Sequence, residues 1–282
     1  MKKNKLIDLH IHSTFSDGIL TPEQIVHQAK ENNVKLIALT DHDTMVGVTP
    51  FLDEAEKEGI PALYGIEFSC QMNGRLLHIL GYNFDRNNPQ ILELLDNFKR
   101  INNRVNKKRL DNFERDFGYR INLNEYPQDG NITPVRLAYW LLETGQISED
   151  EFPEKTHDIY LLFEPEFRAF EKDYLEELPL AETVVEIINK AKGFSILAHP
   201  QSMKVNFGEF LKLYARGLRG IEAFYPEQEP DSYLAWARKM SVAVSAGNDY
   251  HGVLDRTERS IGHLVDPELL KGVYLYTGDI SI

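Results

Sequence analysis

The stretch that decides the fold is residues 5–12, KLIDLHIH. Asp8, His10 and His12 stand at every second position of this stretch, and an apolar residue separates each from the next. Successive side chains of a β-strand point to opposite faces, so the three polar side chains share one face. The stretch therefore predicts a buried strand over Lys5–Ile11 whose carboxyl end carries groups capable of chemistry.

Several other short apolar runs share the length of buried strands. They predict strands at Lys35–Thr40, Ala62–Phe68, Leu76–Tyr82, Phe194–Ala198, Gly220–Phe224 and Val242–Ser245, with a last candidate at Val273–Thr277. Helical patterns lie between many of them. Thr21 predicts the start of one helix, because Pro22 follows it and Gln24 stands three residues later. A second helix is predicted at Phe51–Gly59. Strands that alternate with helices favour an α/β fold with a parallel sheet.

The middle of the chain changes from strand patterns to helical ones. Apolar residues recur at helical spacing from Ile91 towards Phe117. Further helical patterns lie at Val135–Thr144, Phe167–Glu177 and Ala181–Lys192. We therefore predict a helical insertion over residues 84–190, which interrupts a barrel formed by residues 1–83 and 191–282.

The composition restricts the classes of function. With 31 basic and 44 acidic residues among 282, the net charge is −13. An acidic chain disfavours broad binding to duplex DNA or to an anionic membrane surface. The single cysteine, Cys70, excludes an intrachain disulfide and a thiolate zinc site, and we expect a small buried residue there. The chain shows no signal peptide and no long apolar run, so we expect a soluble, cytoplasmic protein.

Most of the remaining polar clusters stand at the ends of the predicted strands. They are Thr40–Asp43, Glu67, His199 and Asn248–His251 at carboxyl ends, and His78 near the start of its strand. In a parallel barrel the carboxyl ends share one face, where active sites are built. Together with His10 and His12, six of the nine histidines stand at such positions. We expect the other three, His27, His157 and His263, to be structural or surface residues.

Histidine combined with carboxylates, without thiolates, suits zinc, manganese or iron. Metal ions that lie close together bind and deprotonate a water molecule and neutralise the charge of a transferring phosphoryl group. A carboxylate such as Glu67 can bridge two ions with its two oxygens. The set as a whole therefore predicts a metal centre.

These motifs, taken in order, resemble those of the PHP (polymerase and histidinol phosphatase) superfamily. They are HIHSTFSDG at 10–18, TDHDT at 40–44, GIE at 65–67, HILGY at 78–82, AHP at 198–200 and GNDYH at 247–251. The resemblance implies a distorted, seven-stranded, TIM-like (β/α) barrel with a cluster of three divalent metal ions. The helical insertion resembles that of small bacterial members that remove the 3′-phosphate of 3′,5′-bisphosphonucleotides and trim RNA 5′ ends.

The resemblance also implies a ligand set. One ion would be held by His10, His12, Glu67 and Asp249. A second would share Glu67 and add His78 and His199. A third would be held by Asp17, His42 and His251. Three carboxylates, Asp8, Asp41 and Asp43, would accept the free N–H groups of ligand histidines. Manganese, iron and zinc all remain open as the metal.

The substrate is less well defined, because one family motif is altered. Nucleotide-cleaving relatives usually carry Arg-Pro-His at the start of a helix in the insertion, whereas this chain has Pro134-Val135-Arg136. Arg136 could still grip a phosphate through two hydrogen bonds, or it could be an exposed helix arginine.

A basic stripe in the insertion supplies further candidates. Arg100, Arg104 and Lys108 recur every four residues and resemble the family's phosphate- or ribose-contacting helix. The stripe faces either a ligand or the acidic helices that follow. Other residues that could line the same mouth are Lys204, Arg256 and Arg259. Tyr82 and Tyr250 could stack on a base, although core packing is the simpler role for both.

We therefore expect a metal-dependent phosphoesterase in which Glu67 and Asp249 hold the ions and a hydroxide bridging two of them attacks phosphorus. His251 or a metal-bound water would protonate the leaving group. The expected partner is a small phosphorylated substrate, a nucleotide or short RNA. Two alternatives remain: a phosphatase of histidinol phosphate or another small phosphomonoester, and a non-catalytic metal-binding accessory module. The sequence leaves the oligomeric state open.

Overall fold

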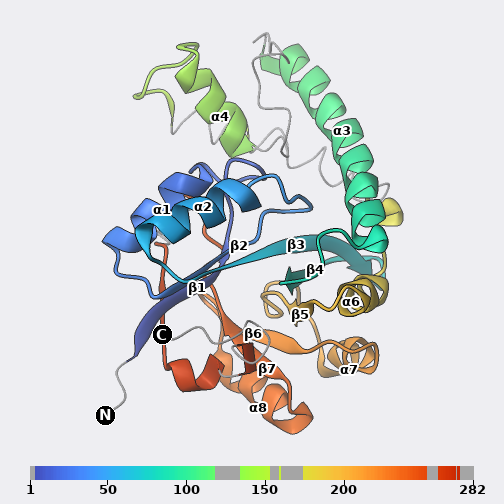
Figure 1. Cartoon of the computed structure of the whole chain (residues 1–282). Coiled ribbons are helices and arrows are strands. Elements are labelled where there is room, and N and C mark those ends of the chain that lie inside the picture. Colours follow the sequence, from blue (N-terminus) through green and yellow to red (C-terminus); the bar gives the residue numbers. More distant parts are fainter. Residues whose placement is uncertain are drawn as a thin grey trace.

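The computed structural model describes residues 4–117, 134–152, 159, 174–252, 260–270 and 272–273. One sheet dominates it, in the strand order β7-β6-β5-β4-β3-β2-β1-β8 (Figure 1). The strands are β1 (Lys5–Ile11), β2 (Leu36–Leu39), β3 (Ala62–Met72), β4 (Arg75–Tyr82), β5 (Phe194–Leu197), β6 (Gly220–Phe224), β7 (Ala243–Ala246) and β8 (His263–Val265). A parallel bridge between Ile11 and Tyr250 joins the end of β1 to the segment after β7 and nearly closes the sheet into a barrel.

The α/β barrel predicted from the sequence is confirmed, but it is not wholly parallel. Strand β4 runs antiparallel to both β3 and β5. Strands β3 and β4 are joined by Asn73 and Gly74 alone, and both have positive φ, 54° and 71°. An Asn-Gly pair in this conformation is the favoured two-residue hairpin turn, so it reverses the chain where a crossover helix would have kept the strands parallel.

The last predicted strand, Val273–Thr277, does not begin where it was expected. Val273 lies in a helical segment, and the rest of the predicted strand Val273–Thr277 falls outside the described residues. The eighth strand is β8, which pairs antiparallel with the first three residues of β1. His263, which we expected to be a structural or surface residue, begins this strand. Pairing with β8 satisfies the backbone groups at an edge of β1 that would otherwise be open.

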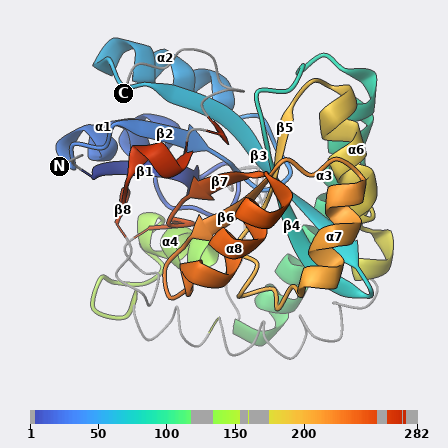
Figure 2. The same ribbon diagram turned by 90° about the horizontal axis from the view of Figure 1, so that it is seen from below.

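Helices surround the barrel (Figure 2). They are α1 (Pro22–Glu31), α2 (Val48–Glu58), α3 (Pro89–Phe117), α4 (Pro134–Glu143), α6 (Ala181–Lys190), α7 (Phe207–Ala215) and α8 (Pro230–Met240), with the short 3-10 helix η1 at Pro267–Leu270. Thr21 caps α1 in a full capping box with Gln24, as predicted. Gly59 ends α2 in the left-handed conformation, also as predicted. None of the described helices has the length and apolar character needed to cross a membrane.

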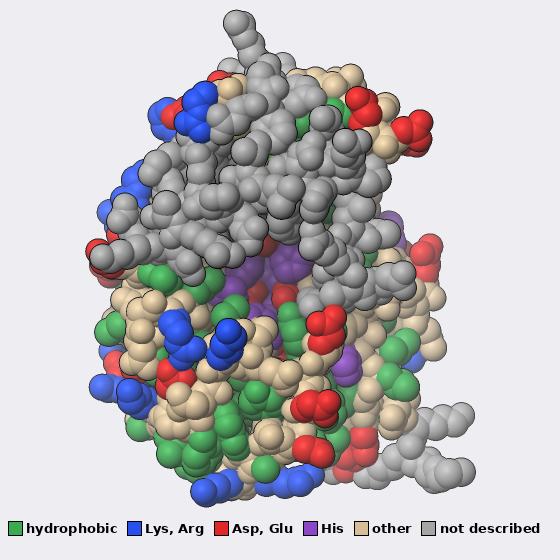
Figure 3. Space-filling model, turned by 180° about the vertical axis from the view of Figure 1, so that it is seen from behind, with side chains coloured by type: hydrophobic (Ala, Val, Ile, Leu, Met, Phe, Trp, Pro, Cys, Tyr) green, Lys and Arg blue, Asp and Glu red, His purple; other side chains and the backbone are tan. Residues whose placement is uncertain are grey.

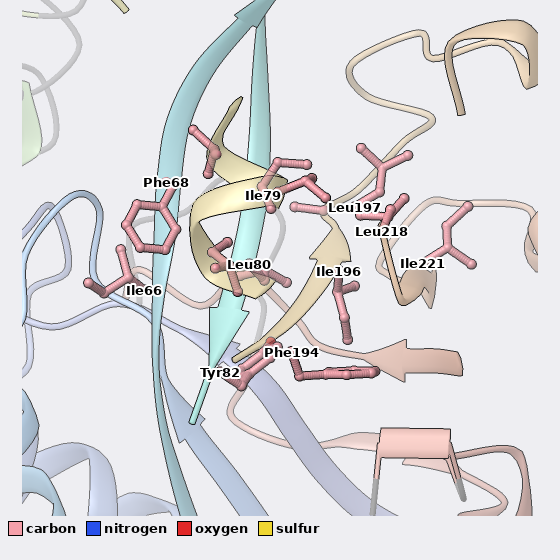
Figure 4. Packing of buried hydrophobic residues seen from close by; sticks show 14 of the residues in the cluster. Ile66, Phe68, Ile79, Leu80, Tyr82, Phe194, Ile196, Leu197, Leu218 and Ile221 are labelled. Carbon is pink, nitrogen blue, oxygen red and sulfur yellow. The ribbon is translucent and has the colours of Figure 1, made fainter. Parts of the chain in front are cut away.

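The main core lies between the sheet and the helices packed on it (Figure 4). Phe68 of β3, Leu80 of β4 and Ile196 of β5 are all fully buried in it. The apolar faces of α6 and of the first part of α3 also pack there, although both lie within the predicted insertion. A separate small core joins the end of α3 to α4 through residues such as Phe113 and Leu141. The last turns of α3 and α4 therefore form a unit that projects from the barrel (Figure 1).

Candidate metal centre

All nine side chains predicted as metal ligands converge at one end of the barrel. They come from β1 and its following loop (His10, His12, Asp17), from the loop after β2 (His42), from β3 and β4 (Glu67, His78) and from the loops after β5 and β7 (His199, Asp249, His251). Figure 3 shows histidine and acidic side chains together in a hollow on one face of the molecule, with Lys or Arg side chains near its edge.

The first group of ligand atoms surrounds one oxygen of Glu67. His10 Nε2 lies 2.9 Å and His12 Nε2 lies 3.1 Å from Glu67 Oε2. Asp249 Oδ1 lies 3.0 Å from His12 Nε2 and 3.3 Å from His10 Nε2. These four residues are the set expected for the first ion, and both histidines are fully buried.

The second group surrounds the other oxygen of Glu67. His199 Nε2 and His78 Nδ1 lie 2.9 Å and 3.0 Å from Glu67 Oε1, and 3.3 Å from each other. His78 reaches this place because β4 is antiparallel. The first half of an antiparallel strand lies beside the carboxyl ends of its neighbours, and His78 is paired with Ser69, two residues beyond Glu67. Glu67 therefore stands between two groups, in the position of a bridging carboxylate.

The third group lies nearer the surface. His251 Nε2 is 3.1 Å from Asp17 Oδ1, and His42 Nε2 is 3.7 Å from Asp17 Oδ2. His42 Nε2 also lies 3.4 Å from Glu67 Oε2, which links this group to the first. The side chain of His251 is 28% exposed, more than that of any other histidine in the centre. This group therefore forms the mouth of the site.

Contacts on the opposite ring nitrogens orient several imidazoles. Ser202 Oγ donates to the carbonyl of His199, so it accepts from His199 Nδ1–H at 2.9 Å. His251 Nδ1–H donates to the carbonyl of Asp249 at 2.8 Å. When Nδ1 carries the proton, Nε2 presents a lone pair, and in both residues Nε2 faces the centre. These histidines are therefore held in the tautomer that binds a metal ion.

Lone pairs and carboxylate oxygens at these distances repel one another unless a cation lies between them. Burial lowers the pKa of His12, but its hydrogen bonds to Asp249 and Glu67 outweigh burial and raise that pKa to about 10. Burial opposes the charged form of Glu67, yet the neighbouring His10 and His78 hold its pKa well below the usual value. The site thus favours positive charge strongly, and its donor set of imidazoles and carboxylates fits divalent Mn, Fe or Zn.

His42 differs from its neighbours. Burial lowers its pKa to about 4, and the attraction of Glu67 and Asp17 does not offset burial together with the repulsion of nearby histidines. His42 is therefore neutral at physiological pH, which is the state in which an imidazole binds a metal ion.

The three further carboxylates have partners other than the expected imidazoles among the contacts described. Asp8 accepts the backbone N–H groups of His10, Asn248 and Gly262, and burial raises its pKa to about 7. Asp43 Oδ1 accepts Ser69 N–H at 2.8 Å. Asp8 and Asp43 therefore hold the backbone of strands and loops near the ligand histidines in place. They support these histidines indirectly, instead of through the expected hydrogen bonds to the imidazole rings.

Asp41 acts on the centre through serines. It accepts the backbone N–H and the hydroxyl of Ser13, and the hydroxyl of Ser16. Ser16 Oγ also lies 3.4 Å from His12 Nδ1. A carboxylate–serine–histidine chain therefore replaces the direct contact implied by the resemblance.

Two residues of β6 and its following loop were missed in the sequence. Glu222 is fully buried, and its carboxylate contacts His10 Nδ1 at 3.2 Å. Tyr225 OH donates to Asp249 Oδ2 at 3.0 Å. The signal for Glu222 was a charged residue inside the apolar run GIEAF, residues 220–224, whereas nothing near Tyr225 in the sequence marks its partner.

The predicted substrate residues are less fully described. Arg104 forms an ion pair with Glu177, so this residue of the basic stripe faces an acidic segment, whereas Arg100 pairs with Asp96 of its own helix. Arg136 and Lys108 lie in α4 and α3, but their side chains are outside the described residues. Lys204 is exposed in the loop after β5, and the two other basic candidates, Arg256 and Arg259, also lie outside the description.

The remaining candidates take structural places. Tyr82 and Tyr250 are almost fully buried, with hydroxyls that contact the carbonyl of Leu9 and the side chain of Gln28, so both pack in the core. Cys70 is buried, and burial raises the pKa of its thiol. Among the other histidines, His27 is half exposed beside Glu54, His263 contacts Asn248, and His157 lies outside the described residues.

Comparison with known proteins gives a consistent result. The family model described as PHP domain matches residues 8–178. A 5′-3′ exoribonuclease of Haemophilus influenzae is 32% identical over 259 residues, which cover 88% of this chain and 90% of that protein. A 3′,5′-nucleoside bisphosphate phosphatase of Chromobacterium violaceum is 26% identical, with 92% of each chain covered. A solved structure of a candidate metal-dependent phosphoesterase from Bifidobacterium adolescentis covers 97% of both chains with a TM-score of 0.74 at 22% identity, which supports the fold.

Proposed function

The chain belongs to the PHP domain family, and from this premise we propose that it is a metal-dependent phosphoesterase that hydrolyses phosphate esters of nucleotides. The proposed substrate is a 3′,5′-bisphosphonucleotide or a short oligonucleotide. One observation carries the proposal: five histidine nitrogens face the two oxygens of Glu67 at 2.9–3.4 Å, in a hollow on one face of the molecule (Figure 3). The relatives named for exoribonuclease and bisphosphate phosphatase activity support the nucleotide class.

We propose three ions, held by the three ligand groups, with manganese, iron or zinc as the metal. Bound divalent ions supply an activated water and neutralise the charge on a transferring phosphoryl group. The protein contributes the geometry. Glu67 ties two groups together, and Asp249 is fixed by Tyr225 on one oxygen while the other faces His10 and His12. The buried donors already lie within 2.9–3.1 Å of the oxygens of Glu67 without an ion, which supports electrostatic preorganisation.

His251 is placed to serve the leaving group. It lies at the mouth of the site, and its Nε2 faces Asp17 at 3.1 Å. Asp17 and His251 would hold a divalent ion or a proton at this place, and either would supply positive charge near the departing oxygen. The acidic character of the whole chain, −13, favours a short ligand held locally over a long nucleic acid held along its backbone.

The test is release of inorganic phosphate from adenosine 3′,5′-bisphosphate by metal-stripped protein reconstituted with Mn²⁺. Histidinol phosphate and a 5′-phosphorylated oligoribonucleotide are run beside it, and the oligonucleotide is followed by mononucleotide release. We expect manganese-dependent turnover of a nucleotide substrate, and loss of turnover in His10→Ala but not in the control His27→Ala, whose histidine contacts a glutamate at the surface. Preferential turnover of histidinol phosphate would contradict the nucleotide assignment, and metal binding without turnover of any ester would contradict the enzyme.

A further inference from the structure

Strand β6 supplies none of the nine expected ligands, yet it places a carboxylate directly behind them. Glu222 is fully buried in the middle of β6, and its carboxylate faces His10 of β1 and His199 in the loop after β5. A buried carboxylate is costly unless charged or polar partners satisfy it. The partners of Glu222 therefore indicate what it does.

One partner is the ring of His10. Glu222 Oε1 and Oε2 lie 3.2 Å and 3.3 Å from His10 Nδ1. A carboxylate can only accept, so Nδ1 carries the proton and donates. Nε2 lies 2.9 Å from Glu67 Oε2, so by the same rule it carries a proton when no ion is bound. Once an ion takes the place of that proton, the proton on Nδ1 leaves the lone pair of Nε2 free to bind the ion. Glu222 thus selects the tautomer of His10 that can bind a metal ion.

The second partner is the backbone of His199. The N–H of His199 donates to Glu222 Oε2 at 2.8 Å. His199 has φ of 22°, a conformation that residues other than glycine rarely adopt and that needs support from its surroundings. The hydrogen bond to Glu222 supplies such support at His199, the residue at which the chain directs an imidazole into the metal centre.

The two histidines serve opposite sides of the centre. His10 Nε2 contacts Glu67 Oε2, and His199 Nε2 contacts Glu67 Oε1. One carboxylate behind the centre therefore orients a donor of the first group and a donor of the second.

Gly247 provides the space for this arrangement. A Cβ atom at Gly247 would lie 2.4 Å from His10 Cβ and 2.9 Å from Glu222 Oε1. Both distances are too short for real atoms, so only glycine allows the ring and the carboxylate to meet here. The loop after β7 therefore needs glycine at this position for His10 and Glu222 to come into contact.

We propose that Glu222 is a positioning residue of the metal centre, which fixes the Nδ1–H tautomer of His10 and the backbone of His199 and so couples two ion positions. The inference rests on the proposed metal centre.

Glu222→Gln tests the proposal with almost no change of shape. An amide has one acceptor oxygen and one donor NH2 group, so the closer of the two contacts with His10 Nδ1, that of Oε1, is replaced by a donor that repels Nδ1–H. The backbone N–H of His199 can only donate and takes the oxygen. The NH2 group then faces His10 Nδ1 and forces the proton to Nε2, where it blocks a ligand position. Loss of such an outer contact typically lowers metal affinity about 10- to 100-fold.

The readout is Mn²⁺ binding by metal-stripped protein, measured by equilibrium dialysis and by calorimetry, with circular dichroism as the check on folding. The control is Glu209→Gln, another buried carboxylate, which contacts Arg75 and Asn73 instead of a ligand histidine. We expect the affinity of Glu222→Gln for Mn²⁺ to fall by the stated factor and that of the control to stay unchanged. A Glu222→Gln variant with wild-type affinity for Mn²⁺ would overturn the positioning role of Glu222 but not the proposed metal centre.

A second measurement needs no variant. In the Zn²⁺-loaded wild type, long-range ¹H–¹⁵N spectra report which nitrogen of each histidine carries a proton, and we expect a proton on His10 Nδ1 and none on Nε2. The opposite pattern would overturn the proposal even if Glu222→Gln failed to fold. Wild-type protein that retained no divalent ion would overturn the proposed metal centre itself, and the role of Glu222 with it.

Discussion

Replacement of Glu67 by glutamine is the sharpest perturbation of the metal centre. The side chain keeps its size, but the bridging charge disappears. Its two oxygens face five imidazole nitrogens at 2.9–3.4 Å, and the residue is fully buried. The amide would also turn an NH2 group towards either the first or the second ligand group. We therefore expect Glu67→Gln to weaken both ion positions that share this residue.

The magnitude follows from the burial. Removal of one partner from a buried set of charges costs about 3–5 kcal/mol, because the remaining charges stay desolvated. Since about 1.4 kcal/mol corresponds to a factor of ten, the affinity for Mn²⁺ should fall about 100- to 4000-fold. The value of kcat/KM should fall by at least the same factor, because turnover needs the ions in place.

The assay is Mn²⁺ titration of metal-stripped protein, followed by phosphate release from adenosine 3′,5′-bisphosphate at a Mn²⁺ concentration below the Kd of the wild type. Glu54→Gln is the matched control. Glu54 Oε1 contacts His27 Nε2 at 2.9 Å, the same kind of contact as that between Glu67 and His10, but on the outer helices α1 and α2. His27 is half exposed, so water screens this pair and the contact is worth little. The control should therefore stay within about twofold of the wild type. A Glu67→Gln variant with wild-type metal content and kcat/KM within about threefold of the wild type would refute the bridging role.

Three further outcomes are expected. Arg136→Gln should raise the KM for adenosine 3′,5′-bisphosphate about tenfold, the worth of one charge-assisted hydrogen bond, with kcat nearly constant; an unchanged KM in steady-state kinetics would exclude a phosphate contact. His12, whose pKa is raised from 6.5 to about 10, stabilises the metal-free fold fully below pH 6.5 and ceases to do so as the pH rises through about 10. The Tm of metal-free protein should therefore fall between pH 7 and 10, whereas with saturating Mn²⁺ the ion replaces the proton and the fall should vanish; equal pH profiles in differential scanning calorimetry would argue against this linkage. Gly247→Ala should lower the free energy of unfolding in urea by about 1–3 kcal/mol and reduce the Mn²⁺ content, because the added Cβ meets His10, and wild-type stability would show that the loop yields instead.

The sequence alone predicted the elements and ligands that depend on local patterns. Alternation around His10 and His12 identified the face of β1, and the Thr21 capping box identified the start of α1. The histidines and carboxylates at strand ends were recognisable because the carboxyl ends of neighbouring parallel strands meet at one place. The motifs that these residues form resemble those of one family, and the structure has the fold of that family.

The tertiary structure decided what depends on partners far apart in the chain. His78 joins the centre because the Asn73-Gly74 turn makes β4 antiparallel, a signal present in the sequence but overlooked. Two pairings depend on packing that no local sequence pattern indicates. They are the ion pair between Arg104 and Glu177 and the pairing of β8 with β1. Glu222 lies 212 positions from His10 along the chain. A charge in an apolar strand shows only that some partner must exist, and only the folded chain determines which one, because burial and hydrogen bonding are properties of the assembled core.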